Sequence, residues 1–359
     1  MKKKEKVWKN NIRKVVPYVP GEQPKDASVI KLNTNENPYP PSPAVQKALE
    51  EMRELRLYPD PAASALVEAI AEYKGIPKEQ VFVGVGSDDV LAMSFLTFFN
   101  SDKPLLFPDV TYSFYDVWAD LFRIPYKTKA LDETFCIKKE DYYEENGGII
   151  FPNPNAPTGL ALPLSEIREI VLHNQESIVI VDEAYVDFGG ESAQSLLGEF
   201  ENLLVVQTFS KSRSMAGLRI GYAMGSPALI KALNDVKYSF NSYTMNEPSI
   251  VMGAASIKDE AYFRKTVARI VSTREWFKGE MRTLGFSFPD SASNFLFVTH
   301  EKVPAKEIFE AARKEGIYVR YFNKKRIDNY LRITIGTDEE MRTFLTFLEK
   351  YLQNYHSNS

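Results

Sequence analysis

Cysteine and histidine are scarce in this 359-residue sequence, which holds one cysteine and three histidines. Cys136 alone cannot form an internal disulfide or a cysteine metal cluster, so disulfide-stabilised secreted classes are excluded and a cytoplasmic location is expected. The histidines His173, His300 and His356 are scattered along the chain. We therefore expect surface histidines rather than metal ligands or general bases, and we predict no metal site.

A strong charge of either sign and a long apolar run are also missing. Forty-four Lys and Arg against 48 Asp and Glu give a net charge of −4, so no overall field draws the chain to nucleic acid or an anionic membrane. The basic start, residues 1–4, is followed by polar residues instead of an apolar stretch. The sequence thus predicts no secretion signal, no membrane span, and no nucleic-acid or membrane partner.

The sequence does contain enough apolar material for a large core. Hydrophobic residues make up 44% and charged residues 26%, which is ordinary for a globular protein. Five short apolar runs each end abruptly in a polar or glycine-rich loop. They are residues 81–83, 105–107, 149–151, 178–181 and 203–206. Because their apolar residues do not alternate with polar ones, we predict parallel strands buried on both faces.

The stretches between these runs have helical periodicity. One example is the stripe of Ile167, Ile170 and Val171, for which Ser165 is the expected N-cap. Strands alternating with helices predict an α/β fold, a mostly parallel sheet between two layers of helices. Such sheets bind ligands beyond the carboxyl ends of their strands, where the loops described above all lie.

The pattern of apolar and charged residues changes after about residue 246. A long charged amphipathic stretch, residues 259–284, precedes alternating segments around residues 295–298 and 331–335. We interpret this part as a connecting helix and a smaller α+β domain. The proline-rich start predicts an extended arm. The expected division is 1–45 for the arm and part of the small domain, 46–245 for the large domain and 246–359 for the rest.

Two basic residues near the end of the last apolar run suggest cofactor chemistry. Lys211 follows that run, and Arg219 comes eight positions later. A lysine amine can form an imine with an aldehyde cofactor, and an arginine fork can hold a phosphate. Either residue taken alone would be explained more simply as a solvated surface side chain.

Asp182 closes another buried run, where a carboxylate gains little unless it meets a cation. A protonated pyridine nitrogen would be such a cation and would make the ring an electron sink. Tyr185, three residues on, could donate to the phenolate oxygen of the ring. An ordinary helix N-cap is the alternative interpretation of Asp182.

The stretch Gly84-Val85-Gly86-Ser87-Asp88-Asp89 is glycine-rich but fails the dinucleotide fingerprint and lacks the P-loop lysine. With Ser87 as the cap of a following helix, its backbone N–H groups could hold one phosphate. An ordinary capped helix start explains the stretch equally well.

Together these residues resemble the fold-type I aminotransferases, which depend on pyridoxal phosphate. The matching motifs are Gly86-Ser87-Asp88, Asn155-Ala156-Pro157-Thr158-Gly159, Asp182-Glu183-Ala184-Tyr185, Ser210-Lys211 and Gly217-Leu218-Arg219-Ile220-Gly221. Three further stretches resemble the histidinol-phosphate aminotransferase family. They are Leu32-Asn33-Thr34-Asn35-Glu36-Asn37-Pro38, Leu57-Tyr58-Pro59-Asp60-Pro61 and Leu331-Arg332-Ile333-Thr334-Ile335-Gly336-Thr337. A chance match of several motifs in order, over roughly residues 10 to 350, is far rarer than a match of one.

The resemblance implies a role for each matching residue. Lys211 is the Schiff-base lysine and proton carrier, Asp182 binds the pyridine nitrogen, and Tyr185 binds the phenolate. The other implied cofactor-binding residues are Gly86, Ser87, Asp88, Ser210 and Arg219 around the phosphate, Tyr112 stacked on the ring, and Tyr58 reaching the phosphate in a partner subunit. The chain is therefore expected to form a homodimer. The implied substrate-binding residues are Arg332, Arg320, Tyr18 and Asn35.

One position departs from the family pattern. The family usually has an asparagine directly before Pro-Thr-Gly, where its amide bonds the phenolate, but this chain has Ala156. We expect Asn155, one residue earlier, to supply that amide through a shifted loop. If it does not, Tyr185 alone stabilises the phenolate.

The implied reaction transfers an amino group from L-glutamate to imidazole-acetol phosphate, giving 2-oxoglutarate and L-histidinol phosphate in histidine biosynthesis. Ping-pong kinetics should follow. An aromatic aminotransferase or a phosphoamino-acid decarboxylase would use the same cofactor residues and stays an alternative. A non-enzymatic regulator would need a helix-turn-helix segment, for which the arm before Leu32 is too short. A nicotinamide dehydrogenase is disfavoured by the failed glycine fingerprint.

Overall fold

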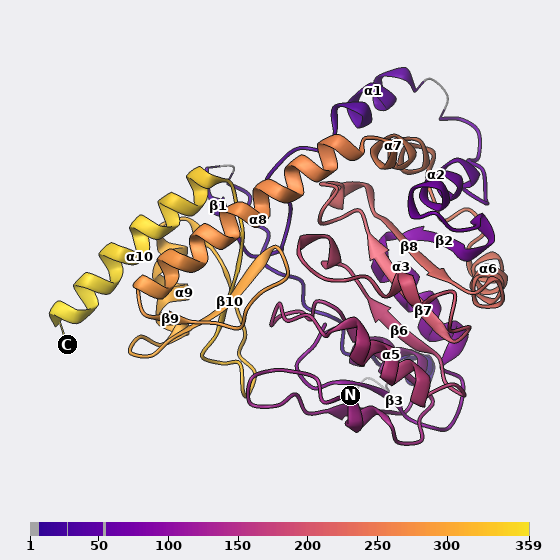
Figure 1. The fold of residues 1–359 in the computed structure, drawn as a ribbon, viewed down its shortest axis with the longest axis horizontal. Helices are drawn as coiled ribbons and strands as arrows, with labels where there is room; N and C mark the ends of the chain where they lie inside the picture. The colour runs from indigo at the N-terminus through magenta and orange to yellow at the C-terminus, as the bar shows by residue number, and fades with distance from the viewer. Residues whose placement is uncertain (1–6, 27, 53–54, 359) are drawn as a thin grey trace, which may run out of the picture.

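The computed structural model describes residues 7–26, 28–52 and 55–358. Its ribbon has a sheet covered by helices at one end and a smaller group of strands and helices at the other (Figure 1). The two longest helices, α8 (Glu260–Thr283) and α10 (Asp338–Asn358), lie side by side over the smaller group.

A seven-stranded sheet forms the centre of the larger group, in the order β2-β8-β7-β6-β5-β3-β4. Its strands are β2 (Val81–Val85), β3 (Leu105–Pro108), β4 (Tyr126–Lys129), β5 (Gly148–Pro152), β6 (Val179–Asp182), β7 (Leu203–Thr208) and β8 (Ile220–Gly225). Strand β8 runs opposite to the other six, so its pairs with β2 and β7 are antiparallel and the remaining pairs are parallel. The five predicted strands are confirmed, whereas β4 and β8 were not predicted.

Helices cover both faces of this sheet, as the apolar strands require. One face packs against α2 (Ser64–Lys74), α5 (Leu164–His173) and α7 (Glu247–Lys258). The other packs against α3 (Gly86–Phe98), α4 (Tyr115–Phe122) and α6 (Pro227–Phe240). Successive residues of a strand serve opposite faces, so Ile149 and Phe151 join the first core while Ile150 joins the second. Helix α1 (Pro43–Glu51) packs on α7.

Both predicted serine caps are wrong. Helix α5 begins at Leu164 after Pro163, so Ser165 lies inside its first turn, although Ile167, Ile170 and Val171 are buried as predicted. Proline at the N-cap favours this early start because its φ is already helical.

Helix α3 likewise begins earlier than predicted, at Gly86, directly after strand β2. The Asp89 carboxylate accepts the N–H of Val85, the N-cap residue, at 2.9 Å. The Ser87 side chain makes no capping bond.

The smaller group contains the antiparallel strands β9 (Phe286–Ser287), β10 (Phe295–His300), β12 (Arg320–Tyr321) and β13 (Leu331–Thr334), with helix α9 (Ala305–Lys314). The predicted helix at residues 259–284 is α8, capped by the Asp259 side chain. Strand β1 (Ile30–Lys31) pairs with β11 (Ile317–Tyr318), which joins the arm to this group. The domain boundaries at residues 45 and 245 stay a prediction.

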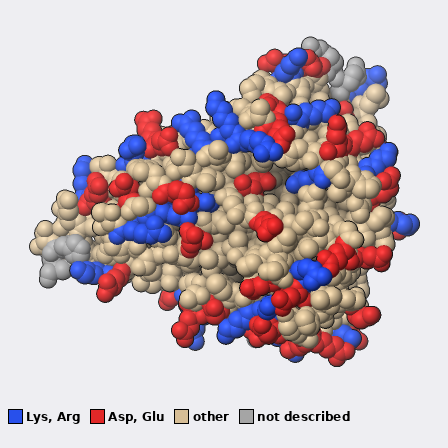
Figure 2. Space-filling view, viewed as in Figure 1, with Lys and Arg blue, Asp and Glu red and all other residues tan. Residues whose placement is uncertain are grey.

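Charges on the face seen in Figure 2 are mixed, with basic and acidic side chains interspersed. None of the helices in the described residues is long and apolar enough to cross a membrane. The expectation of surface histidines is wrong for His300, which is 5% exposed and packs edge-on to Phe286. His173 is exposed as expected.

Candidate active site

Two adjoining cavities open at the carboxyl end of the parallel strands. The sheet cavity, of about 100 Å³, is lined mainly by strand-end residues, among them Ser87, Asp182, Ser210 and Arg219. The arm cavity, of about 150 Å³, is lined by residues of the N-terminal arm, of the smaller strand group and of the loops that follow β3, β5, β6 and β7. Four residues line both cavities, and they are Tyr112, Ala156, Tyr185 and Lys211. The two cavities therefore share one boundary, at which the Lys211 amine lies.

Lys211 follows strand β7 and is held through both its backbone and its amine. Asn37 donates from Nδ2 to the carbonyls of Lys211 and Ser212, each at 3.1 Å. The Lys211 Nζ donates to the Thr34 carbonyl at 3.2 Å and lies 5.7 Å from the ring centre of Tyr185. The amine therefore contacts a neutral carbonyl and an aromatic ring, and it forms no ion pair with a carboxylate of the described chain.

Asp182 is the last residue of β6 and is 4% exposed. Its carboxylate accepts from the hydroxyl of Tyr115 at 2.9 Å and from the N–H of Ala184 at 3.3 Å, and it forms no ion pair with the described residues. Burial raises the pKa of Asp182 to about 6, against these two donors, which lower it. A buried carboxylate of this kind would be stabilised by a cationic ligand in the sheet cavity.

An anion cradle lies at the start of helix α3. The Arg219 guanidinium contacts Asp88 at 3.0 Å and Ser210 Oγ at 3.5 Å, and Arg219, Ser210 and Ser87 all line the sheet cavity. Gly86, with φ of +82°, brings the loop so close to Arg219 that a Cβ there would lie 2.5 Å from its Nη2. The helix N-terminus, a hydroxyl and a guanidinium together suit a phosphate.

Tyr112 forms part of the wall common to both cavities. Its hydroxyl donates to Asp88 at 2.7 Å, so Asp88 links this ring to Arg219. Burial and the Asp88 carboxylate raise the pKa of Tyr112 well above its usual value, so the phenol stays neutral. The ring is therefore fixed at the edge of the sheet cavity.

The arm cavity contains the four predicted substrate residues, Tyr18, Asn35, Arg320 and Arg332. Arg332 donates from Nη2 to the carbonyl of Asn33 at 3.1 Å, while its buried Nε has no partner in the described residues. Burial, together with the nearby Arg320, lowers the pKa of Arg332. Two guanidiniums and an unpaired N–H favour an anion in this cavity.

Asn155 was predicted to bind the cofactor, and the structure contradicts this. Its Nδ2 donates to the carbonyl of Val110 at 3.1 Å and to Thr158 Oγ1 at 2.9 Å, and Asn155 lines neither cavity. The loop does not shift because Asn155 also closes it through its backbone, by bonds to Leu160 and Gly159. Ala156, whose side chain has no polar atom, lines both cavities instead.

Tyr58 lies outside both cavities of its own chain. It is 82% exposed and packs against Tyr243 with ring centres 4.7 Å apart. This placement agrees with a role at another subunit, which stays a prediction.

Sequence reasoning missed two residues that hold the site together. No role was predicted for Tyr115, whose hydroxyl bonds Asp182. Asn37 belongs to the motif at residues 32–38, so its presence there was the only signal of its contact with the Lys211 backbone. No cluster of His, Cys, Asp or Glu suited to a metal ion occurs in the described residues.

The arrangement combines an amine, a buried carboxylate and two anion sites along adjoining cavities. The sheet cavity suits a ligand with a cationic ring nitrogen and a phosphate, and the arm cavity suits a second anionic ligand. The amine at their boundary can act as a nucleophile or as a base.

Comparison with known proteins supports the resemblance. Residues 27–348 match the family model of aminotransferase class I and II. A histidinol-phosphate aminotransferase of Lactococcus lactis subsp. cremoris strain MG1363 is 54% identical over 349 residues, covering 97% of this chain and 98% of that protein. One from Clostridium botulinum strain Okra is 50% identical over 349 residues, covering 97% of this chain and 99% of that protein.

Among solved structures, a histidinol-phosphate aminotransferase from Sinorhizobium meliloti in complex with pyridoxal-5'-phosphate matches with a TM-score of 0.83. It is 21% identical, and the match covers 91% of each chain. This likeness confirms the predicted fold-type I α/β class. The chain belongs to the class I and II aminotransferases.

Proposed function

We propose that this protein is a histidinol-phosphate aminotransferase. It transfers the amino group of L-glutamate to imidazole-acetol phosphate, giving L-histidinol phosphate and 2-oxoglutarate. One observation carries the proposal: the two arginines of the arm cavity, with the unpaired Nε of Arg332, border the same space as the Lys211 amine. Relatives that are 50 to 54% identical over nearly the whole chain carry this name.

The cofactor is pyridoxal phosphate, and the sheet cavity fits it. Asp182, whose pKa burial raises to about 6, gains a cationic partner when a pyridinium nitrogen lies beside it. Arg219, Ser210, Ser87 and the Gly86 backbone suit the phosphate. When bound, the cofactor supplies an aldehyde carbon that carries the amino group and a ring that withdraws electrons from the substrate.

Lys211 would bond to the cofactor and move the proton. Once an amino donor has displaced it from the cofactor, its neutral Nζ would take the proton from the substrate carbon that bears the amino group. The Thr34 carbonyl orients the amine, and Asn37 fixes the backbone from which it extends. Tyr112 would hold the ring in position, and the Tyr185 hydroxyl would bond the phenolic oxygen, since both residues line the two cavities.

Arg332 binds the anionic end of each substrate. A carboxylate of glutamate and the phosphate of imidazole-acetol phosphate both match the guanidinium fork, and Arg320 adds a second positive charge. Tyr18 packs on Phe114 with ring centres 4.1 Å apart and closes one side of the arm cavity. Because both substrates use one site in turn, the kinetics should be ping-pong.

We also propose a homodimer in the cytoplasm, in which Tyr58 reaches the cofactor phosphate of the partner subunit. Exposed apolar side chains that adjoin Tyr58 support an interface there. They are Leu55 and Leu57, close to it in the sequence, and Tyr243, whose ring packs against it. Exposed apolar groups of this size gain free energy when a second subunit covers them.

The function is tested by initial rates for a panel of amino donors with 2-oxoglutarate as the acceptor. We expect L-histidinol phosphate to have the highest kcat/KM, with aromatic amino acids far behind. Lys211→Ala protein serves as the control and should be inactive with every donor. Turnover of an aromatic donor with none of histidinol phosphate would contradict the proposal, and release of CO₂ from phosphoserine or phosphothreonine would favour a decarboxylase.

A further inference from the structure

The side chain of Asn35 is bonded directly to the hydroxyl of Tyr185. Asn35 is 1% exposed, and its Nδ2 donates to Tyr185 Oη at 2.8 Å. Thr334 Oγ1 accepts the Asn35 N–H at 3.0 Å and donates to Asn35 Oδ1 at 3.2 Å. In this arrangement the amide oxygen of Asn35 accepts from Thr334, and the NH₂ group faces Tyr185.

This contact determines where the proton of Tyr185 can go. A phenol has one proton to donate, and here its oxygen already accepts from Asn35. Within the described chain the hydroxyl donates to no protein group, while Tyr185 lines both cavities. A donor to the phenol oxygen also polarises the O–H and strengthens the bond that it gives. The proton is thus directed to a ligand.

No neighbouring side-chain amide can replace the Tyr185 hydroxyl as a hydrogen-bond donor to the ligand. Ala156 lines both cavities but has no polar side-chain atom, and the amide of Asn155 is bonded to Val110 and Thr158. Tyr185 is therefore left as the neutral hydrogen-bond donor of this part of the wall, and its alignment matters more than it would beside a second donor.

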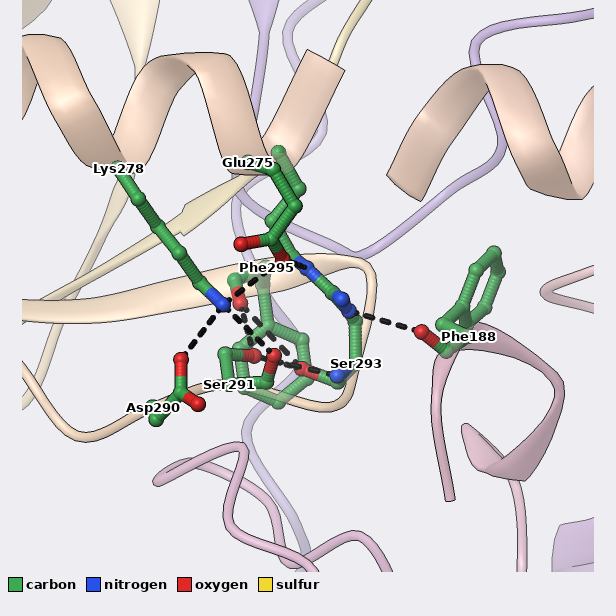
Figure 3. A network of polar contacts seen from close by, with 8 residues as sticks. Phe188, Glu275, Lys278, Asp290, Ser291, Ser293 and Phe295 are labelled. Atoms are coloured by element: carbon green, nitrogen blue, oxygen red, sulfur yellow. Dashed lines mark hydrogen bonds and ion pairs between the residues drawn. The ribbon is translucent and has the colours of Figure 1, made fainter. Parts of the chain in front are cut away.

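One buried arginine, Arg274, bonds to the backbone close to both Asn35 and Tyr185. Arg274, 5% exposed, donates from Nη1 to the carbonyl of Phe188 at 2.9 Å and to that of Ser293 at 2.7 Å. Phe188 ends the short helix that Tyr185 precedes, and Asn294 beside Ser293 donates to the Asn35 carbonyl at 3.0 Å. Figure 3 shows Phe188 and Ser293 within a network that also includes Lys278 and Asp290.

We infer that Asn35 is a positioning residue that acts through Tyr185, by aligning and polarising the hydroxyl that bonds the phenolic oxygen of the cofactor. This inference rests on the proposed function, because it needs pyridoxal phosphate bonded at Lys211. It assigns to Asn35 a task separate from substrate binding. The Tyr185 hydroxyl stabilises negative charge on the phenolic oxygen. The pKa of the lysine-bound cofactor should therefore be lower than it would be without this hydrogen bond.

The test is a spectrophotometric pH titration of the lysine-bound cofactor without substrate. Tyr185→Phe removes the whole hydrogen bond and should raise the protonation midpoint by about 1 to 2 pH units. Asn35→Gly should raise it by about 0.5 to 1 pH unit, since it weakens the same bond without removing it. Glycine is the suitable replacement because Asn35 has φ of +57°, where a larger residue would add backbone strain.

A double-mutant cycle separates this role from a general structural one. If Asn35 acts through Tyr185, Asn35→Gly should have no further effect on the midpoint in a Tyr185→Phe background. Thr334→Val, which frees the Asn35 amide to turn, should give a smaller rise and serves if Asn35→Gly does not fold. Asn202→Ala is the matched control, because the Asn202 amide bonds the carbonyls of Asn174 and Ser177 and Asn202 lines neither cavity, so its midpoint should equal that of wild type.

The inference would be overturned if the midpoint is unchanged in both Asn35→Gly and Thr334→Val. It would also be overturned if Asn35→Gly shifts the midpoint by the same amount in the Tyr185→Phe background. Wild-type protein that forms no lysine-bound chromophore would instead overturn the proposed function.

Discussion

Gly221 is where a single methyl group should damage the anion cradle most specifically. It lies in β8 opposite Gly84 of β2, where β8 passes beneath the start of helix α3. A Cβ at this position would lie 2.2 Å from the backbone nitrogen of Ser87 and 2.3 Å from the carbonyl carbon of Gly86. These are backbone atoms of the loop proposed to hold the phosphate, so no side-chain rotation can relieve the contact.

The expected magnitude follows from the distance that must be gained. Ordinary contacts begin at 3.4 Å, so Gly221→Ala requires the loop to move by about 1 Å. Overpacking of this kind costs about 1 to 3 kcal/mol. If the loop carries the displacement, the Kd of the apoenzyme for pyridoxal phosphate should rise by about 5- to 140-fold, at tenfold for each 1.4 kcal/mol.

The assay is titration of apoenzyme with pyridoxal phosphate, followed by absorbance, with the thermal midpoint measured in parallel. Gly217→Ala is the matched control, since a Cβ there would meet nothing within 4 Å, and its Kd should stay within about twofold of wild type. A Gly221→Ala protein that binds as tightly as the control would refute the assignment of this loop to the phosphate.

Three further outcomes follow from the charges of the site. Asp182→Asn should weaken cofactor binding by about ten- to a hundredfold above pH 6. The difference in affinity from wild type should shrink below pH 6, because Asp182 becomes protonated there. Equal affinities of the two proteins at pH 8 would exclude the carboxylate from cofactor binding. Burial raises the pKa of Glu183 to about 7, so the folded state favours the neutral acid, and its contribution to stability is complete below pH 4.5 and lost as the pH rises through 7. Urea unfolding of apoenzyme at pH 5 and pH 8 should therefore give a loss about 2 to 3 kcal/mol larger for wild type than for Glu183→Gln, and identical losses would rule this out. Arg332→Lys should raise the KM for histidinol phosphate by about ten- to a hundredfold with an unchanged cofactor spectrum, because lysine cannot present the planar fork; an unchanged KM would move the anion site elsewhere.

Much of the sheet could be predicted because strands buried on both faces leave a distinct pattern. Strand β7 is such a run, and its continuous apolar residues serve the two cores alternately. Strand β8 escaped prediction because it contains the small residues Gly221, Ala223 and Gly225, which fit a crowded antiparallel position but carry little strand signal. Strand β4 is an edge strand with exposed residues, so its sequence shows no burial pattern.

The parts of the candidate site that could be predicted are those that depend on the sheet. Residues that end parallel strands, such as Asp182 and Lys211, meet at one edge whatever the details of the loops, so their convergence could be predicted. The direction of the Asn155 side chain could not, because it depends on bonds to Val110 and Thr158 that form only when the loop closes. The bond from Asn35 to Tyr185 joins residues 150 positions apart and leaves no local signal.

The role of Lys211 can be tested by borohydride reduction and peptide mapping of protein loaded with pyridoxal phosphate. We expect one labelled peptide, containing Lys211, and no label in Lys211→Ala protein. Prior addition of L-histidinol phosphate should remove the label, because the amino donor displaces the lysine. A label on another lysine would show that Lys211 does not bond the cofactor. A Lys211 label removed by aromatic amino acids but not by histidinol phosphate would show that the protein acts on a different amino donor.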